Sequence, residues 1–291
     1  MRWLRARRQR ATESRLAWIL GSPRSGSTWL LQMLVDTGDV LPSDEPNIGV
    51  HLAPFTFERP GMHAADFSDE NSTLYRFGRR QHGYFFSDHH QPAWREPLRE
   101  LICARYAFAS DWKIVAIKEP HGAQAADLIS TAVPQSRFLF LLRDGRDVVD
   151  SQLAGQSPGG WVTREYGLRA VGEGQERRAF LTDMAWQWVW RTRIAHEVFE
   201  RHPGPKLLVK YEDLRRDTES HLGAILEWLE IEADAAAIAR QHAYDRAESS
   251  GPAERVRSGT SGTWRDHLDS GEQELLAEIM GPALRESGYE A

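Results

Sequence analysis

Cysteine and long hydrophobic runs are the two features that this sequence lacks most clearly. Cys103 is the only cysteine among 291 residues, so the chain has no cysteine pair for an internal disulfide or for a metal site. We therefore expect Cys103 to be a small, buried, apolar residue in a protein of a reducing compartment. The apolar run at residues 16–20 ends at Gly21 and is far too short for a signal or membrane-spanning segment, which favours a cytoplasmic location.

Positive charge is also scarce beyond the first ten residues. The formal net charge is −6, although five arginines stand near the N-terminus (Arg2, Arg5, Arg7, Arg8 and Arg10). The rest of the chain is therefore more acidic than the total suggests, which argues against a nucleic-acid partner. We expect residues 1–15 to form a basic, disordered tail, and weak contact of this tail with a membrane surface is the alternative interpretation.

Four short apolar runs, each followed by a helical pattern, indicate an α/β fold. The runs lie at residues 16–20, 113–118, 137–142 and 206–210. Alternating strands and helices are typical of a parallel sheet, and continuously apolar strands are typical of a sheet that helices cover on both faces. The sequence therefore predicts four central strands of a P-loop-like sheet in a single domain, residues 16–291. Long helices are predicted at 177–201, 215–230, 234–243 and 270–286.

Strong periodicity is missing from residues 39–112, between the first two runs. A connection of this length exceeds an ordinary βα loop, so we interpret it as a large insertion after the first helix. Its aromatic and histidine residues suit the lining of an acceptor pocket, and a small core beneath a long loop is the other interpretation. These residues are Phe55, Phe57, Phe67, Tyr84, Phe85, Phe86, Trp94, His51, His63, His82, His89 and His90. The histidine spacing matches no zinc motif, so we expect no metal site.

An anion-binding loop is predicted at residues 21–28, GSPRSGST, between the first strand and an apolar helix at 29–35. Such a turn directs backbone N–H groups and the positive end of a helix dipole at one point, where phosphate or sulfate binds. A nucleoside-triphosphatase loop would have lysine where Ser27 stands, whereas the cation here is Arg24. The third strand is likewise followed by a cation, Arg143, where magnesium would need a carboxylate. The loop is therefore suited to an anion without a metal ion.

These residues resemble the sulfotransferases that use 3'-phosphoadenosine 5'-phosphosulfate (PAPS). The phosphosulfate loop of that family is similar to residues 22–29, and its arginine and serine eight residues apart correspond to Arg143 and Ser151 in LLRDGRDVVDS. Tyr211 in VKYEDL and the C-terminal RVRSGTSGTW match in the same order. The resemblance implies metal-free transfer of a sulfuryl group from PAPS to an acceptor hydroxyl, with release of adenosine 3',5'-bisphosphate (PAP).

The resemblance also implies a set of nucleotide-binding residues. Arg143, Ser151 and Arg257 would hold the 3'-phosphate, while Arg24 would act on the sulfuryl oxygens and the 5'-phosphate. Trp29 would either stack on the adenine or belong to the core face of its helix. The complete expected set is Arg24, Ser25, Gly26, Ser27, Thr28, Trp29, Arg143, Ser151, Tyr211, Arg257, Ser258 and Gly259.

A base must also take the proton of the acceptor hydroxyl. The sequence KEP at 118–120 resembles the Lys-acidic-Pro motif of tyrosylprotein and related bacterial sulfotransferases, the branch to which the motifs are closest. That branch has a glutamate base whose distance from the phosphosulfate loop corresponds to Glu45, which stands 21 residues after Arg24. Glu45 is therefore the preferred base, and Lys118 is expected to stabilise charge on the sulfuryl group.

Two other residues compete with Glu45 for the role of base. Cytosolic small-molecule sulfotransferases have a histidine two residues after the equivalent lysine, and His121 is displaced from that position by one residue. Glu119 is the third candidate. Asn47 stands where the tyrosylprotein branch has an arginine, which argues against a peptide acceptor.

The sequence leaves the acceptor open among small molecules, carbohydrates and lipids that carry a hydroxyl group. Two other functions share the expected fold. A P-loop-type kinase using ATP and Mg²⁺ is disfavoured by Ser27 and Arg143. A catalytically silent nucleotide-binding protein is disfavoured by the presence of Arg24, Lys118 and Glu45.

Overall fold

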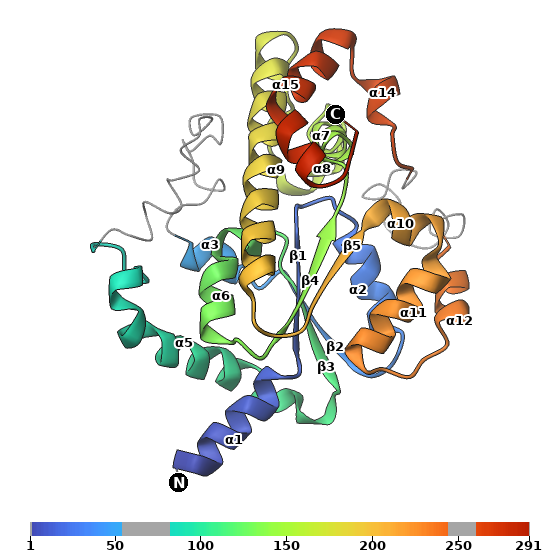
Figure 1. Cartoon of the computed structure of the whole chain (residues 1–291). Coiled ribbons are helices and arrows are strands. Elements are labelled where there is room, and N and C mark those ends of the chain that lie inside the picture. The colour runs from blue at the N-terminus through green and yellow to red at the C-terminus, as the bar shows by residue number, and fades with distance from the viewer. Residues whose placement is uncertain (1, 54–81, 244–259, 291) are drawn as a thin grey trace.

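A parallel sheet of five strands forms the centre of the protein (Figure 1). The computed structural model describes residues 2–53, 82–243 and 260–290. The strands lie in the order β2-β3-β1-β4-β5, and every neighbouring pair is parallel. Their bounds are Leu16–Gly21 (β1), Val40–Asp44 (β2), Ile114–Lys118 (β3), Arg137–Leu142 (β4) and Lys206–Lys210 (β5). The α/β fold and the four predicted strands are confirmed, and β2 is an additional strand.

Successive side chains of β1 point to opposite faces of the sheet, and both faces are covered. Leu16, Trp18 and Leu20 belong to one core cluster, whereas Ala17 and Ile19 belong to another. All six residues of β1 are buried, because β1 lies between β3 and β4. This explains why the strand is continuously apolar in the sequence.

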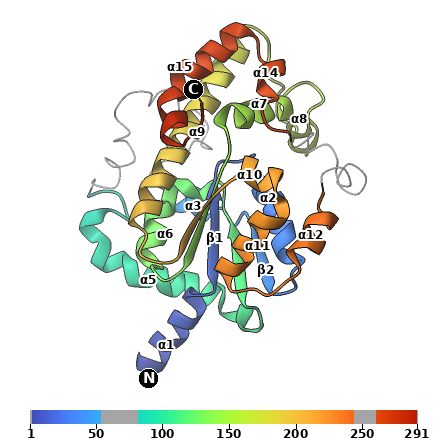
Figure 2. The ribbon, with the colours of Figure 1, turned by 45° about the vertical axis from the view of Figure 1, so that its right-hand side comes forward.

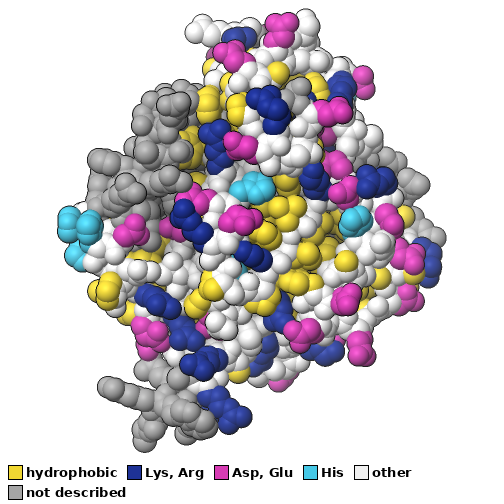
Figure 3. All heavy atoms as spheres, in the orientation of Figure 1, with side chains coloured by type: hydrophobic (Ala, Val, Ile, Leu, Met, Phe, Trp, Pro, Cys, Tyr) yellow, Lys and Arg dark blue, Asp and Glu magenta, His cyan; other side chains and the backbone are white. Residues whose placement is uncertain are grey.

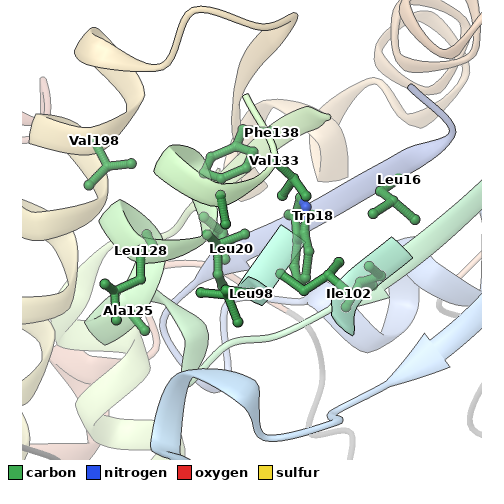
Figure 4. Close-up of a cluster of buried hydrophobic side chains, with 14 of the residues drawn as sticks. Leu16, Trp18, Leu20, Leu98, Ile102, Ala125, Leu128, Val133, Phe138 and Val198 are labelled. Atoms are coloured by element: carbon green, nitrogen blue, oxygen red, sulfur yellow. The ribbon is translucent and has the colours of Figure 1, made fainter. Parts of the chain in front are cut away.

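Helices form one layer on each side of the sheet, as Figure 2 shows. One layer contains α5 (Gln91–Arg105), α6 (Ala126–Ala132) and part of α9 (Gln175–Arg201), and Figure 4 shows apolar residues of these helices in the same cluster as Trp18. The other contains α2 (Ser27–Val35), α10 (Tyr211–Arg216), α11 (Thr218–Leu229) and α12 (Ala235–Gln241). Each Leu or Ile buried in these layers stabilises the fold by about 1.5–3 kcal/mol.

A third cluster lies beyond the carboxyl ends of the strands. It joins α7 (Gly145–Gly155), the first half of α9, α14 (Trp264–His267) and α15 (Ser270–Glu286), with α8 (Trp161–Tyr166) beside α7. Asp269 and Glu272 form a reciprocal capping box that begins α15 where the sequence predicts it. The predicted helices at 177–201 and 270–286 are confirmed, while the one at 215–230 divides into α10 and α11. Of the described helices, none is both long and apolar enough to cross a membrane.

The expectation of a disordered N-terminal tail is wrong, because the structure has a helix there, α1 (Arg2–Glu13). Its C-terminal residue Glu13 is fully buried and accepts hydrogen bonds from Arg99 Nε at 2.8 Å and from the Gln135 backbone N–H at 2.6 Å. A buried carboxylate needs such partners, and they fix the end of the helix to α5 and to the turn before β4. Lys and Arg side chains are visible on the lower left of Figure 3, over α1 and α5.

The expectation that all four apolar runs are central strands is wrong for β5. This strand is at an edge of the sheet, next to β4 only, and four of its five residues are half-buried. Lysines at both ends, Lys206 and Lys210, keep the exposed edge polar, as is usual for edge strands. Cys103 is buried in α5, as predicted, and burial raises its pKa to about 11.

The segment predicted as an insertion contributes structure to both the sheet and its cover. Besides β2 it contains α3 (Ile48–Leu52), the short η2 (Asp88–His90), α5 and η3 (Ala107–Asp111), while residues 54–81, with Phe55, Phe57, Phe67 and His63, lie outside the described part. Trp94 is in the core and Phe86 packs against it, so these two aromatic residues belong to the core of the protein, as in the second of the two interpretations above. Phe85 is 78% exposed.

Candidate functional site

The predicted phosphate loop joins the carboxyl end of β1 to α2. Gly26 precedes α2 in the left-handed conformation, with φ of 90°. A Cβ atom at Gly26 would lie 2.4 Å from the Tyr211 ring, so no larger residue fits here. The chain therefore turns sharply, and the first N–H groups of the nine-residue helix α2 lie at the end of the loop, where an anion is favoured.

Two donors near the loop support an anion at this point. The Ser25 hydroxyl is buried and has no hydrogen-bond partner among the described residues, and the same is true of Arg143 Nε. Buried polar groups normally have partners, so unpaired donors beside a helix N-terminus fit an anionic ligand. Ser27, at the lysine position of a triphosphatase loop, is buried as well.

Arg24, Arg143 and Ser151 lie close together. From the sequence, Arg143 and Ser151 are expected at the 3'-phosphate and Arg24 at the sulfuryl end, and the structure adds a direct contact between Arg24 and Ser151. Arg24 Nε donates to Ser151 Oγ at 3.0 Å, and an Arg143 side-chain N–H donates to the Arg24 carbonyl oxygen at 2.9 Å. These contacts join the loop after β1 to the end of β4 and to α7. Arg24 has a positive φ of 71° and also lies over the Trp161 ring, 5.2 Å from its centroid. Two guanidinium groups and a hydroxyl thus converge, as a phosphate group requires.

The Tyr211 ring packs against this cluster. Its ring is only 1% exposed, Gly26 packs against it, and the Arg143 guanidinium lies 4.4 Å from its centroid. Trp29 meets the Tyr211 ring edge-to-face at 6.2 Å and donates from Nε1 to the His242 carbonyl oxygen at 3.2 Å. Trp29 also packs against the core beneath α2, as one of its two predicted roles requires.

A second group of charged residues surrounds Lys118 at the end of β3. The Lys118 ammonium is 3% exposed and lies 2.6 Å from Asp44 Oδ1, 2.7 Å from Glu45 Oε1 and 3.1 Å from Thr28 Oγ1. An ammonium group has three N–H donors, and three oxygens face it here. Lys118 therefore connects the end of β2 to the first turn of α2, and it places the predicted base, Glu45, beside the predicted loop residue Thr28.

His121 is placed less favourably than Glu45 for the role of base. It precedes η4 (Gly122–Ala125), and its Nδ1 lies 3.5 Å from a side-chain nitrogen of Arg191 on α9. This ring nitrogen therefore faces Arg191, whereas the Glu45 carboxylate contacts Lys118 directly. The third candidate, Glu119, is fully buried and points at the backbone after Glu45, where Oε2 accepts from the Ile48 N–H at 3.0 Å. Burial above all raises the pKa of Glu119 to about 7.

Two acidic residues at the site were not predicted from the sequence. Asp44 and Glu45 both form ion pairs with the Lys118 ammonium. In the sequence, only the position of Asp44 directly before Glu45 indicates that it belongs to the site. Asp147, on α7, accepts the backbone N–H of Gly262 at 2.7 Å and that of Trp264 at 3.4 Å. It thereby connects the helix that carries Ser151 to the end of the RVRSGTSGTW sequence. Burial raises the pKa of Asp147, since desolvation outweighs these hydrogen bonds.

Three predicted nucleotide-binding residues, Arg257, Ser258 and Gly259, lie outside the described residues. Among the described site residues, Lys118, the phosphate loop and Arg143 stand at the carboxyl ends of three adjacent parallel strands, β3, β1 and β4, and Tyr211 follows β5. The connection after β1 passes through α2 on one face of the sheet, and the connection after the neighbouring β3 passes through α6 on the other face. Ligands of open α/β sheets bind at such switch points.

A family model of sulfotransferases, described as "Sulfotransferase family", matches residues 17–235. This match spans most of the chain, from β1 to the start of α12, and includes the phosphate loop, Lys118, Arg143 and Ser151. The chain belongs to the sulfotransferase family. That membership supports sulfuryl transfer as the general activity of this sulfotransferase. A search of curated protein sequences finds no match.

Two solved sulfotransferase structures are similar in fold. A mouse sulfotransferase, SULT7A1, complexed with PAP has a TM-score of 0.55 and 14% identity, over 94% of this chain and 89% of that one. The sulfotransferase STF9 from Mycobacterium avium has a TM-score of 0.50 and 16% identity, over 95% of this chain and 77% of that one. At these identities the similarity establishes the fold. Within the described residues, no three His, Cys, Asp or Glu side chains are grouped so as to hold a metal ion.

Proposed function

We propose that this protein transfers the sulfuryl group of PAPS to an acceptor hydroxyl and releases PAP. The observation that carries the proposal is the pairing of two sites at neighbouring strand ends. One contains Arg24, Arg143 and Ser151 around the phosphate loop, and the other contains Lys118 beside Glu45. A donor with phosphates at one end and a sulfuryl group at the other needs both.

Arg143 and Ser151 bind the 3'-phosphate in this proposal, together with Arg257, while the amides at the start of α2 bind the 5'-phosphate. Arg24 already contacts Ser151, so its side chain belongs to the binding cluster and exchanges that hydroxyl for phosphate oxygens. The unpaired Ser25 hydroxyl and Arg143 Nε supply further donors.

Chemistry takes place at Lys118 and Glu45. The acceptor oxygen attacks sulfur in line with the bond to the 5'-phosphate; that S–O bond breaks, and its electron pair leaves with PAP. Glu45 accepts the hydroxyl proton. A carboxylate has further lone pairs after one oxygen accepts from Lys118, so Glu45 can take the proton without leaving the lysine. The ammonium of Lys118 stabilises the charge on the sulfuryl oxygens and on the departing phosphate.

The acceptor in this proposal is a small molecule, a carbohydrate or a lipid with a free hydroxyl group. Glu45 and the KEP sequence support a place near the tyrosylprotein branch of the family, while Asn47 argues against a peptide acceptor. The reaction needs no metal ion in this proposal, because arginine, lysine and backbone donors suffice for the smaller charge of a sulfuryl group.

Ligand-dependent thermal stability tests the donor. We expect PAP to raise the melting temperature far more than ATP with Mg²⁺, because a ligand at about one hundred times its Kd stabilises the native state by about 2.7 kcal/mol. Differential scanning fluorimetry with each nucleotide at the same concentration measures this. An equal or larger shift with ATP and Mg²⁺ would favour a kinase instead.

A further inference from the structure

Glu119 is the buried acidic residue of the KEP sequence, and the proposed chemistry does not use it. Its side chain is 0% exposed, Oε1 has no hydrogen-bond partner among the described residues, and Oε2 accepts the Ile48 backbone N–H at 3.0 Å. The backbone N–H of Asn47 also stabilises its charged form. Burying a carboxylate costs several kcal/mol of folding free energy, so the groups that Glu119 contacts indicate its function.

Those partners belong to the short turn that carries Glu45. The turn runs from the end of β2 to the start of α3, and both Glu45 and Asn47 have positive φ, 46° and 58°. This conformation is uncommon for residues other than glycine and costs about 1–3 kcal/mol at each position. The backbone N–H of Glu45 donates to the Lys118 carbonyl oxygen at 2.9 Å, so the turn is held from both sides.

The packing around Glu119 leaves the turn little freedom. A Cβ atom on Gly122 would lie 2.1 Å from Glu119 Cγ, and one on Gly49 would lie 2.3 Å from Gly122 Cα and 2.6 Å from the His121 carbonyl oxygen. Helix α3 therefore lies directly against η4, with the Glu119 side chain enclosed beside them. The Glu119 side chain therefore lies between Gly122 and the backbone N–H of Ile48.

We propose that Glu119 is a positioning residue, which holds the backbone of residues 45–48 so that the Glu45 carboxylate faces Lys118. The inference rests on the proposed role of Glu45 as base. A base misplaced by about 1 Å loses roughly a hundredfold in rate, so a residue that fixes the base affects turnover without touching the substrate. Glu119 itself takes no proton from the acceptor, since it is enclosed behind the turn.

A double-mutant cycle with Glu45 tests this role. Glu119→Ala is expected to lower kcat about ten- to a hundredfold while PAP affinity stays within about threefold. In the Glu45→Gln background the same change should lower kcat by less than about threefold, since the base is already gone. PAP-induced thermal shifts verify that each variant is folded.

Three outcomes separate the possible failures. Equal losses of kcat in both backgrounds, or a parallel loss of PAP affinity, would show a general structural role and overturn the proposal. Near-normal turnover in Glu45→Gln with a low kcat in Glu119→Ala would overturn the base assignment and with it the positioning role. Unchanged kcat in Glu119→Ala, with Glu45→Gln inactive, would overturn the positioning role alone.

Two further variants keep the test sharp if Glu119→Ala does not fold. Glu119→Gln keeps the size of the side chain and one acceptor oxygen for Ile48, so kcat should fall by less than about tenfold; a loss as large as that of Glu45→Gln would make Glu119 the base. Gly49→Ala forces α3 away from η4 and should reduce kcat without changing PAP affinity. Normal kcat in a folded Gly49→Ala protein would contradict the importance of the turn.

Discussion

Glu45→Gln is expected to lower turnover by about a hundredfold or more and to leave PAP affinity nearly unchanged. Glutamine keeps the shape of the side chain and can still accept from Lys118, but it cannot take the hydroxyl proton. Glu45 lies with Lys118, apart from the cluster of Arg143 and Ser151 that is proposed to bind the 3'-phosphate. Steady-state turnover with a genuine acceptor and calorimetric titration with PAP measure the two effects.

Asp44→Asn is the matched control, because Asp44 is the neighbouring carboxylate on the same ammonium group. Its removal should lower turnover by less than about tenfold, since a carboxylate on Lys118 is lost but the base is kept. His121→Ala tests the competing assignment. Near-normal turnover in Glu45→Gln together with an inactive, folded, PAP-binding His121→Ala protein would transfer the role of base to His121.

Arg143→Ala is expected to reduce PAP affinity by a factor of about ten to a few hundred. The change removes a charge-assisted contact with the 3'-phosphate, and it also removes the hydrogen bond that holds the Arg24 carbonyl oxygen of the phosphate loop. Tyr211 would lose the guanidinium that covers its ring. Isothermal titration with PAP gives the affinity directly.

Arg201→Ala provides the control for the loss of one arginine. Arg201 is the last residue of α9, its side chain is 74% exposed, and it pairs with Glu197 on the same helix, so PAP affinity should not change. Equal PAP affinity in Arg143→Ala and the unmodified protein would remove Arg143 from the donor site. A loss of turnover without a loss of affinity would contradict the assignment in the same way.

The central strands could be predicted because each of them is a run of consecutive apolar residues, which is typical of a strand buried on both faces. β2 could not, since its sequence VLPSD contains one buried residue, Val40, and a proline that only an edge strand tolerates. The helix α1 was missed for a related reason. Its arginines suggest a solvated tail, whereas the residue that anchors it, Glu13, depends on Arg99 and Gln135, which are far away in the sequence.

Some features of the candidate site could likewise be predicted from the sequence, and others could not. The positions of Arg143 and of the phosphate loop relative to the strand ends follow from motif spacing, whereas the contact between Arg24 and Ser151 is seen only in the structure. The surroundings of Glu119 could not be predicted, because its burial and its contact with the 45–48 turn depend on how α3 packs against η4. From the sequence Glu119 is a third candidate base, and its burial behind the turn, which the sequence does not reveal, is the basis for the positioning role that we propose.

The central claim is sulfuryl transfer from PAPS, and transfer of sulfur-35 label from PAPS to a panel of hydroxyl acceptors in the presence of EDTA tests it most directly. The account predicts that label moves to at least one acceptor class, that PAP forms in equal amount, and that the chelator has no effect. The Glu45→Gln protein, folded and binding PAP, should transfer about a hundredfold more slowly. Label transfer that EDTA abolishes and Mg²⁺ restores, or phosphoryl transfer from ATP in place of sulfuryl transfer, would contradict the account.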